Sequence, residues 1–318
     1  MEKTYNLGLI QQVRAYMERN HLSQNQLAAK AGLSSAALSG YLNQNYKGSI
    51  ENTERQLVEF LRIADEQAAA AEQAGEYSPC SSYVPTSISE DVYQSIRYAQ
   101  VGHCMVVLHG DAGVGKSKGA QKFVEDHPGT AVLVKVEPCT CTLAGVIQTI
   151  ATKLQVSGRN RMEQIMGIHA KLDGTNIVLI IDEAQLLNYA ALEQIRALND
   201  DNPNTGKRGV GIALIGNSDV YDRMHGRQQA RFAQLFNRIQ LPREYRCSKV
   251  TMTDVEKLFP ALASRGMRKE LEFLLAVSHS EHGVRGAVKL YENAVSSRDV
   301  SYANLYKMAA HMHVDRLG

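Results

Sequence analysis

The chain has 318 residues, of which 44% are hydrophobic and 21% are charged, and its formal net charge is +2. The length excludes a single small domain, and the composition excludes an intrinsically disordered chain. No stretch of about 18 apolar residues is available to span a membrane, and the N-terminus lacks the basic start and apolar block of a secretory signal. We therefore expect a cytoplasmic protein that makes no membrane contact.

The first predicted domain covers residues 1–74 and is helical. Ser23 and Gln26 have the spacing of a capping box, and Gly32 is placed to end the helix that this box begins. A second short helix is predicted over residues 35–42. Two short helices joined by a tight glycine turn form a helix-turn-helix, and this one is similar to the phage-repressor class of the motif.

Two roles for this domain stay open. The second helix, SSAALSGYLN, contains no arginine or lysine, and residues 1–75 carry 7 basic against 8 acidic side chains, which favours a bundle used for protein contact. Proteins that read DNA sequence place arginine, asparagine or glutamine against base edges. Asn43, Gln44 and Asn45 are candidates for such contacts.

An α/β domain follows a predicted linker at residues 75–87, where glycine, proline and serine replace the helical pattern. Residues 88–242 alternate short β-branched runs with helical stretches, which is typical of a parallel sheet covered by helices on both faces. The predicted fold class is therefore α/β, with the sheet sandwiched by helices. The predicted strands are residues 104–109, 131–136, 177–182, 211–216 and 238–241.

The remaining residues, 243–318, show no strand pattern and are predicted to form a C-terminal helical lid. Thr253 and Glu256 are spaced to cap one of its helices. Further helices are predicted over residues 267–278, 284–297 and 301–312.

Positive charge is concentrated in one segment. Residues 205–250 carry 9 Lys or Arg against 3 Asp or Glu. A cluster of this kind attracts the phosphates of a nucleotide or of DNA.

The stretch VVLHGDAGVGKSKG has the phosphate-loop pattern, behind a predicted strand and ahead of a predicted helix. Its glycines let backbone amides turn inward around phosphates. Lys116 supplies positive charge to the β and γ phosphates, and Ser117 offers its hydroxyl to Mg²⁺, so ATP and Mg²⁺ are the predicted ligands. The nucleotide-binding residues predicted here are Gly110, Asp111, Ala112, Gly113, Val114, Gly115, Lys116, Ser117 and Lys118.

Polar side chains follow two further predicted strands. Asp182 and Glu183 end the apolar run NIVLIID, at the edge where open α/β sheets bind ligands. Asp182 is predicted to hold the hydrated Mg²⁺, and Glu183 to polarise the water that attacks the γ-phosphate. Asn217 follows the fourth strand, where its amide is placed to orient this water, although a turn residue is the more common reason for an asparagine after glycine.

Together these features resemble an AAA+ ATPase, a P-loop NTPase with a helical lid, over residues from about 88 to 318. The resemblance implies that Asn217 is the first sensor and that Arg285, in GVRGAVKLY, reaches the γ side of the nucleotide from the lid. It also implies an arginine finger that a neighbouring subunit supplies. Arg238 is the first candidate for this finger and Arg231 the second.

With the repressor-like domain in front, nearly the whole chain resembles the phage Mu B family of transposition proteins. This resemblance implies an ATP-dependent, largely sequence-neutral DNA-binding protein of a bacterial or phage-infected cell. It implies a homo-oligomer that forms helical filaments on double-stranded target DNA, delivers that DNA to a DDE transposase and stimulates strand transfer. The transposase would in turn trigger ATP hydrolysis.

DNA contacts are expected first in the loop SGRNRMEQ, which is markedly basic in that family. Here the loop keeps two arginines but places Asn160 between them, so part of the DNA contact is expected to lie elsewhere. The DNA-binding residues predicted on this basis are Arg159, Arg161, Lys171, Lys207, Arg208, Arg223 and Arg227.

Two other functions remain as alternatives. A helper or helicase-loader ATPase of the IstB or DnaC kind shares the core, but the repressor-like domain argues against it. A transcription regulator in which nucleotide gates the helix-turn-helix would bind one operator tightly. The lack of arginine and lysine in the second helix of the motif argues against this second reading.

Overall fold

The computed structural model describes residues 5–20, 22–75, 83–203, 205–225 and 235–314. The chain divides into two compact units, Met1–Tyr77 and Ser78–Gly318. Among the described residues, none of the helices is both long and apolar enough to cross a bilayer.

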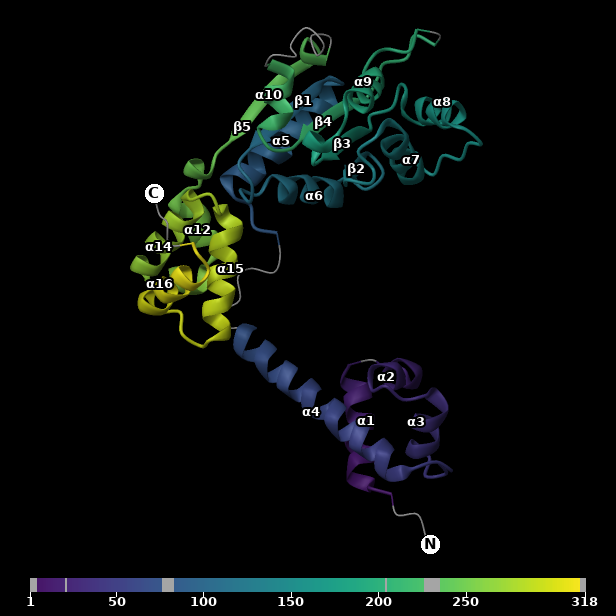
Figure 1. Cartoon of the computed structure of the whole chain (residues 1–318), viewed down its shortest axis with the longest axis vertical. Helices are drawn as coiled ribbons and strands as arrows, with labels where there is room; N and C mark the ends of the chain where they lie inside the picture. The colour runs from purple at the N-terminus through teal and green to yellow at the C-terminus, as the bar shows by residue number, and fades with distance from the viewer. Residues whose placement is uncertain (1–4, 21, 76–82, 204, 226–234, 315–318) are drawn as a thin grey trace. The chain divides into compact units, whose positions relative to one another are not determined.

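The first unit is helical, as predicted (Figure 1). The capping box at Ser23 and Gln26 is confirmed, because each side chain accepts a hydrogen bond from the backbone N–H of the other residue. Gly32 has a φ of +70°, the left-handed conformation that favours glycine, between two helices at the predicted positions. The helices are α1 (Leu7–Arg19), α2 (Gln24–Lys30), α3 (Ser35–Leu42) and α4 (Ile50–Gly75).

A small apolar core holds these helices together. Val13 of α1, Leu27 of α2, Leu38 of α3 and Leu57 of α4 are fully buried against one another. Tyr41 is also buried, and its hydroxyl donates to the carboxylate of Glu54 over 2.8 Å. All four helices therefore contribute buried residues to one core.

The second unit is built on a five-stranded parallel sheet in the order β2-β3-β4-β1-β5, which confirms the predicted sheet. The parallel order brings the carboxyl ends of all five strands to one edge. The predicted boundary at residues 242/243 falls inside the last strand, which continues to Tyr245. The strands are β1 (Met105–Gly110), β2 (Ala131–Lys135), β3 (Val178–Asp182), β4 (Gly211–Ile215) and β5 (Ile239–Tyr245).

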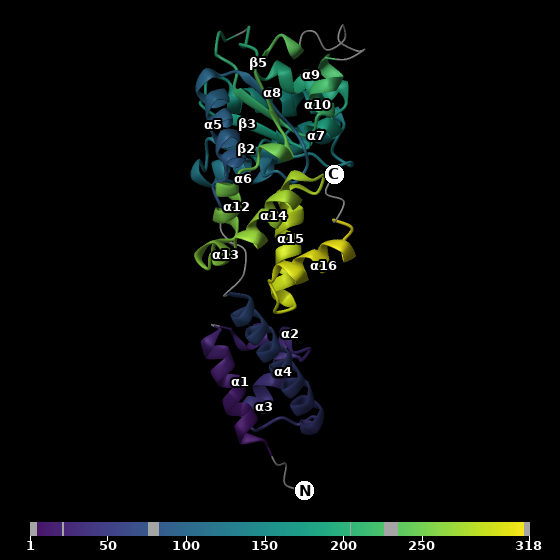
Figure 2. The same cartoon turned by 90° about the vertical axis from the view of Figure 1, so that its left-hand side faces the viewer.

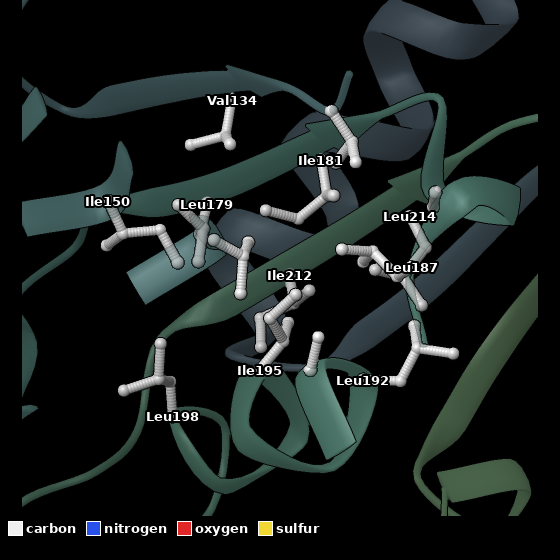
Figure 3. Packing of buried hydrophobic residues seen from close by; sticks show 14 of the residues in the cluster. Val134, Ile150, Leu179, Ile181, Leu187, Leu192, Ile195, Leu198, Ile212 and Leu214 are labelled. Carbon is white, nitrogen blue, oxygen red and sulfur yellow. The ribbon is translucent and has the colours of Figure 1, made fainter. Parts of the chain in front are cut away.

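Helices cover both faces of this sheet. On one face, Leu179 and Ile181 of β3 and Ile212 and Leu214 of β4 pack with Ile195 of α9 and with α7 (Figure 3). On the other face lie α5 and α6, which also pack against each other. The helices around the sheet are α5 (Ser87–Gly102), α6 (Lys116–Asp126), α7 (Leu143–Lys153), α8 (Arg161–Leu172), α9 (Tyr189–Ala197) and α10 (Asp219–His225), with the short turn η1 (Ala184–Leu186).

The helices that follow β5 are called the lid (Figure 2). The cap predicted at Thr253 and Glu256 is wrong. The capping box is formed two residues earlier, by Thr251 and Asp254. Asp254 also accepts hydrogen bonds from the backbone N–H and the hydroxyl of Ser87, at 2.7 Å each, and this contact selects the register. The lid comprises η2 (Cys247–Lys249), α12 (Met252–Leu258), α13 (Pro260–Ser264), α14 (Arg268–His279), α15 (Gly283–Ser296) and α16 (Tyr302–His311).

The corrected cap gives a stability prediction. We expect Thr251→Ala to destabilise the second unit by about 1 kcal/mol, since an N-cap side chain satisfies an otherwise unpaired helix N–H. For a unit of this size the loss lowers the Tm by about 2–4 °C. Thr253→Ala is the matched control and is expected to leave the Tm nearly unchanged, because Thr253 is exposed in the first turn. Scanning calorimetry of the full chain measures both, and a larger shift for Thr253→Ala would contradict the assignment.

Candidate active site

The phosphate loop, residues 110–117, runs from the last residue of β1 into the first turn of α6, and three glycines shape its backbone. Gly110, Gly113 and Gly115 all have positive φ values, between +76° and +128°. A Cβ at Gly110 would lie 2.1 Å from the carbonyl oxygen of Tyr245 in β5, so only glycine fits there. The loop ends at the N-terminus of α6, where free backbone N–H groups favour anions.

Lys116 points into this loop. Its side chain is buried, with 8% exposed, and its ammonium donates to the carbonyl oxygens of Gly110 (2.9 Å) and Asp111 (2.6 Å). Burial lowers the pKa of Lys116, and the nearby carboxylates of Asp111, Asp182 and Glu183 oppose that shift. The loop therefore carries a positive charge in its interior, fixed where the first strand ends. Lys118, by contrast, lies exposed on α6.

Asp182 ends β3 beside the loop and is 6% exposed. Burial raises the pKa of Asp182, and a hydrogen bond from the Ser117 hydroxyl opposes that shift. A carboxylate and a hydroxyl are hard oxygen ligands of the kind that Mg²⁺ takes together with phosphate oxygens. The donor set at Ser117 and Asp182 therefore fits Mg²⁺, and these two predicted ligands lie together.

Glu183 follows in a left-handed conformation, with φ +59°. Its backbone N–H donates to the Asp182 carboxylate over 3.0 Å, and its own carboxylate accepts a hydrogen bond of 2.6 Å from the side-chain amide of Gln185. The Gln185 carbonyl in turn accepts from the backbone N–H of Asn217 over 3.3 Å. Gln185 was missed by the sequence reasoning, which had no signal for it beyond its place two residues after Glu183.

Asn217 stands at the end of β4, as predicted, but its side chain is engaged locally. Its amide nitrogen donates to the Asp219 carboxylate over 2.9 Å, and its oxygen accepts from the Asp219 backbone N–H over 3.0 Å. This pairing starts α10. The side chain of Asn217 therefore serves a turn, the alternative that the sequence had left open for it.

The start of lid helix α15 rests on the loop. The backbone N–H of Arg285 donates to the carbonyl oxygen of Gly113 over 3.1 Å. Gly283, with φ +59°, lies so close that a Cβ there would be 2.8 Å from the oxygen of Ala112. Arg285 itself is exposed, so its backbone is held at the loop while its side chain is accessible to solvent.

The junction of β5 and the lid is tied to the same loop by contacts that the sequence did not predict. The Asp111 N–H donates to the carbonyl oxygen of Tyr245, and the Asp111 carboxylate accepts from the N–H of Cys247, over 2.8 and 2.7 Å. Burial, together with the charge of Asp111, raises the pKa of the Cys247 thiol to about 11. The thiol is therefore protonated at neutral pH and adds no charge beside Lys116.

Arg238, the first candidate for an arginine finger, is 55% exposed and pairs with Asp200 of the same chain, with 2.8 Å between Nη2 and Oδ1. Asp200 also pairs with Arg196 at the end of α9. Arg231, the second candidate, lies outside the described residues. Arg238 thus stands at the surface in a contact that a stronger acceptor can replace.

The predicted DNA contacts divide into three groups. Arg159, Arg161 and Lys171 are exposed at or on α8, and the loop before the helix is fixed because the N–H of Arg159 donates to Glu163 over 2.7 Å. The second group, Lys207 and Arg208, is also exposed. The third group contains Arg223 and Arg227.

The structure does not support the prediction that Arg223 contacts DNA phosphate. It is half-buried, and its guanidinium donates to the carbonyl oxygens of Gln185 (2.9 Å) and Leu187 (3.1 Å), so it holds the η1 turn. The physical reason is that Arg223 lies on the inner side of α10, which packs beside this turn. Arg227 lies outside the described residues.

Comparisons with known proteins agree with this geometry. A family model described as an AAA domain matches residues 100–224. The chain is 29% identical over 289 residues to the Mu-like prophage FluMu DNA transposition protein B of Haemophilus influenzae, covering 90% of this chain and 96% of that protein. It is 25% identical over 276 residues to the ATP-dependent target DNA activator B of Escherichia phage Mu, covering 86% and 83%.

Among solved structures, Cdc6p from Pyrobaculum aerophilum is similar with a TM-score of 0.51 and 16% identity, covering 75% of this chain and 70% of that one. At this identity the likeness concerns the fold alone.

The geometry of the loop predicts the effect of removing its charge. We expect Lys116→Ala to weaken ATP binding by about 10- to 100-fold, since one charge-assisted hydrogen bond to phosphate is lost at about 1.5–3 kcal/mol. Folding should be retained, because the substitution removes a buried charge. Lys122→Ala, about a turn and a half further along α6, is the control, because Lys122 is half-buried and pairs with Asp126 away from the loop. Calorimetric titration with ATP measures the affinity of each variant, and equal affinities would contradict the assignment of Lys116 as a phosphate ligand.

Proposed function

Because the chain is an AAA+ ATPase that resembles the B transposition proteins of Mu-like phages over most of its length, we propose that it activates target DNA for transposition. It binds double-stranded DNA in an ATP-dependent, largely sequence-nonspecific manner, oligomerises on it, and delivers it to a transposase. The observation that carries this proposal is that the similarity covers 86–90% of the chain and thus extends well beyond the AAA domain.

ATP is bound by the loop amides and by the Lys116 ammonium. When bound, Mg²⁺, held by Ser117 and Asp182, neutralises charge on the phosphates. Glu183 positions and deprotonates the attacking water as a general base. The support for these roles is that all of these groups end or follow β1 or β3, whose carboxyl ends lie at one edge of the sheet on either side of β4.

Hydrolysis is completed between subunits in this proposal. Arg238 leaves Asp200 and reaches the γ-phosphate held by a neighbouring copy, where it stabilises the charge of the transition state. A homo-oligomer built by one repeated head-to-tail contact forms a helical filament if the contact does not close into a ring. ATP binding then favours assembly on DNA, and hydrolysis, triggered by a DDE transposase, favours release.

Phosphate contacts come first from Arg159 and Arg161, at the start of α8. Both are exposed, and the loop that carries them is held by Asn160, whose side chain accepts the N–H of Glu163 over 2.9 Å. Lys171, Lys207 and Arg208 are the further contacts. Contacts of lysine and arginine to phosphate carry no sequence information, which fits a protein that accepts many target sequences.

The test of the proposed function is fluorescence anisotropy on two unrelated duplexes, with ATP, with ADP and without nucleotide. We expect ATP-dependent binding of equal affinity to both duplexes, and loss of that dependence in Lys116→Ala. Arg159→Ala and Arg161→Ala should each weaken binding and lower the slope of log K against log salt by about one unit. Arg268→Ala, an exposed lid residue paired with Glu272, is the control.

Tight binding to one duplex whatever the nucleotide would overturn the proposal in favour of a regulator. Negative-stain microscopy of the same samples tests assembly, because the proposal expects filaments with ATP and DNA only. Stimulation of a partner transposase is the next measurement when both results hold.

The finger assignment predicts complementation. Arg238→Ala and Lys116→Ala should each have little ATPase activity with DNA at an ATP concentration that the weakened site does not fill, the first because it lacks the finger and the second because it binds little ATP. In a one-to-one mixture, random head-to-tail pairing restores roughly a quarter of the interfaces, and with them part of the rate. Mixing Arg238→Ala with the double variant Lys116→Ala/Arg238→Ala is the matched control. Recovery in neither mixture would exclude Arg238 as the finger.

A further inference from the structure

Gln185 occupies a position that neither the phosphate loop nor the lid explains. It lies in η1, directly after β3, and both ends of its side-chain amide are used. The nitrogen donates to the Glu183 carboxylate over 2.6 Å, and the oxygen accepts the backbone N–H of Asn217 over 3.3 Å. One side chain therefore bridges the ends of β3 and β4.

The chemistry of these two partners fixes the orientation of the amide. An ionised carboxylate only accepts hydrogen bonds, and a backbone N–H only donates. A side chain placed between them must donate at one end and accept at the other. Glutamine does both at this length, whereas glutamate and leucine do not.

The residues around Gln185 leave space for its side-chain amide and fix its backbone. A Cβ at Gly216 would lie 2.4 Å from the Gln185 side-chain oxygen and 2.5 Å from a methyl group of buried Val220, so a larger residue there would push on both side chains. The backbone of Gln185 is fixed from α10 by Arg223, which donates to its carbonyl oxygen over 2.9 Å. Arg223 thereby ties η1 to the helix that follows Asn217.

We propose that Gln185 is a positioning residue for ATP hydrolysis, which orients the Glu183 carboxylate and links it to the end of β4. A general base must be held close to its productive geometry, and displacement of about 1 Å lowers rates by about 100-fold. The hydrogen bond of Gln185 to the carboxylate is charge-assisted and therefore short and directional. The proposal rests on the proposed role of Glu183.

The test is steady-state ATPase activity of the full chain with duplex DNA. We expect Gln185→Ala to lower kcat by about 10- to 100-fold with KM for ATP nearly unchanged. Gly216→Ala, which crowds the Gln185 amide together with Val220, should also lower kcat. Gln121→Ala, an exposed glutamine of α6, is the matched control.

Gln185→Glu gives a signature that a purely structural role would not give. At neutral pH the new carboxylate faces Glu183 with like charge and has no proton to donate. As the pH falls through its pKa, it gains a proton and the donor returns. The ratio of the Gln185→Glu rate to the wild-type rate should therefore rise as pH falls, whereas the ratio for Gln185→Ala stays flat.

Glu183→Gln separates the two proposals. Loss of kcat in Glu183→Gln together with an unchanged or increased kcat in Gln185→Ala would overturn the role of Gln185 alone. Retained kcat in Glu183→Gln would overturn the general-base assignment and with it this inference. Loss of kcat in Gln185→Ala with a flat pH ratio for Gln185→Glu would reduce Gln185 to a packing residue and also overturn the proposal.

Discussion

A buried ammonium group at the end of β1 is the constraint on which the site depends. Lys116 is removed from water, and an unpaired buried charge is costly. The Lys116 ammonium donates hydrogen bonds to the carbonyl oxygens of Gly110 and Asp111. Three nearby carboxylates also oppose the fall in its pKa that burial causes. That arrangement requires β1 and β3 to end at the same edge, as they do in this parallel sheet.

The same loop is also where the lid is attached. Asp111 accepts from Cys247 just after β5, Gly113 accepts from Arg285 at the start of α15, and Asp254 holds Ser87 at the start of α5. Burial raises the pKa of Asp254, but the hydrogen bonds from Thr251 and Ser87 outweigh it and leave the pKa below its usual value. The phosphate loop therefore contacts the lid at η2, just after β5, and at the start of α15, while Asp254 ties α12 to the start of α5.

Much of this fold was predictable because a strand that is buried on both faces of a sheet must be apolar along nearly its whole length. The five strands are near-continuous apolar runs, and all five lie within a few residues of their predicted positions. Local signals were weaker guides. Thr251 with Asp254 and Thr253 with Glu256 have the same spacing, and only the distant contact with Ser87 selects the first pair. Gln185, Arg223 and the pairing of Arg238 with Asp200 also depend on partners far along the chain, so no pattern in the sequence pointed to them.

The pairing of Arg238 bears on why a lone subunit would hydrolyse ATP slowly. An ion pair this exposed contributes about 0–1 kcal/mol, so Asp200 does not hold the arginine against a stronger acceptor. The triphosphate of a neighbouring subunit is such an acceptor, because it presents more negative charge in a site with less water. In the absence of a neighbour, the weak pair keeps the guanidinium at the surface, away from its own phosphate loop. Under the proposed mechanism, activity therefore depends on the contact between subunits, and DNA promotes it by bringing subunits together.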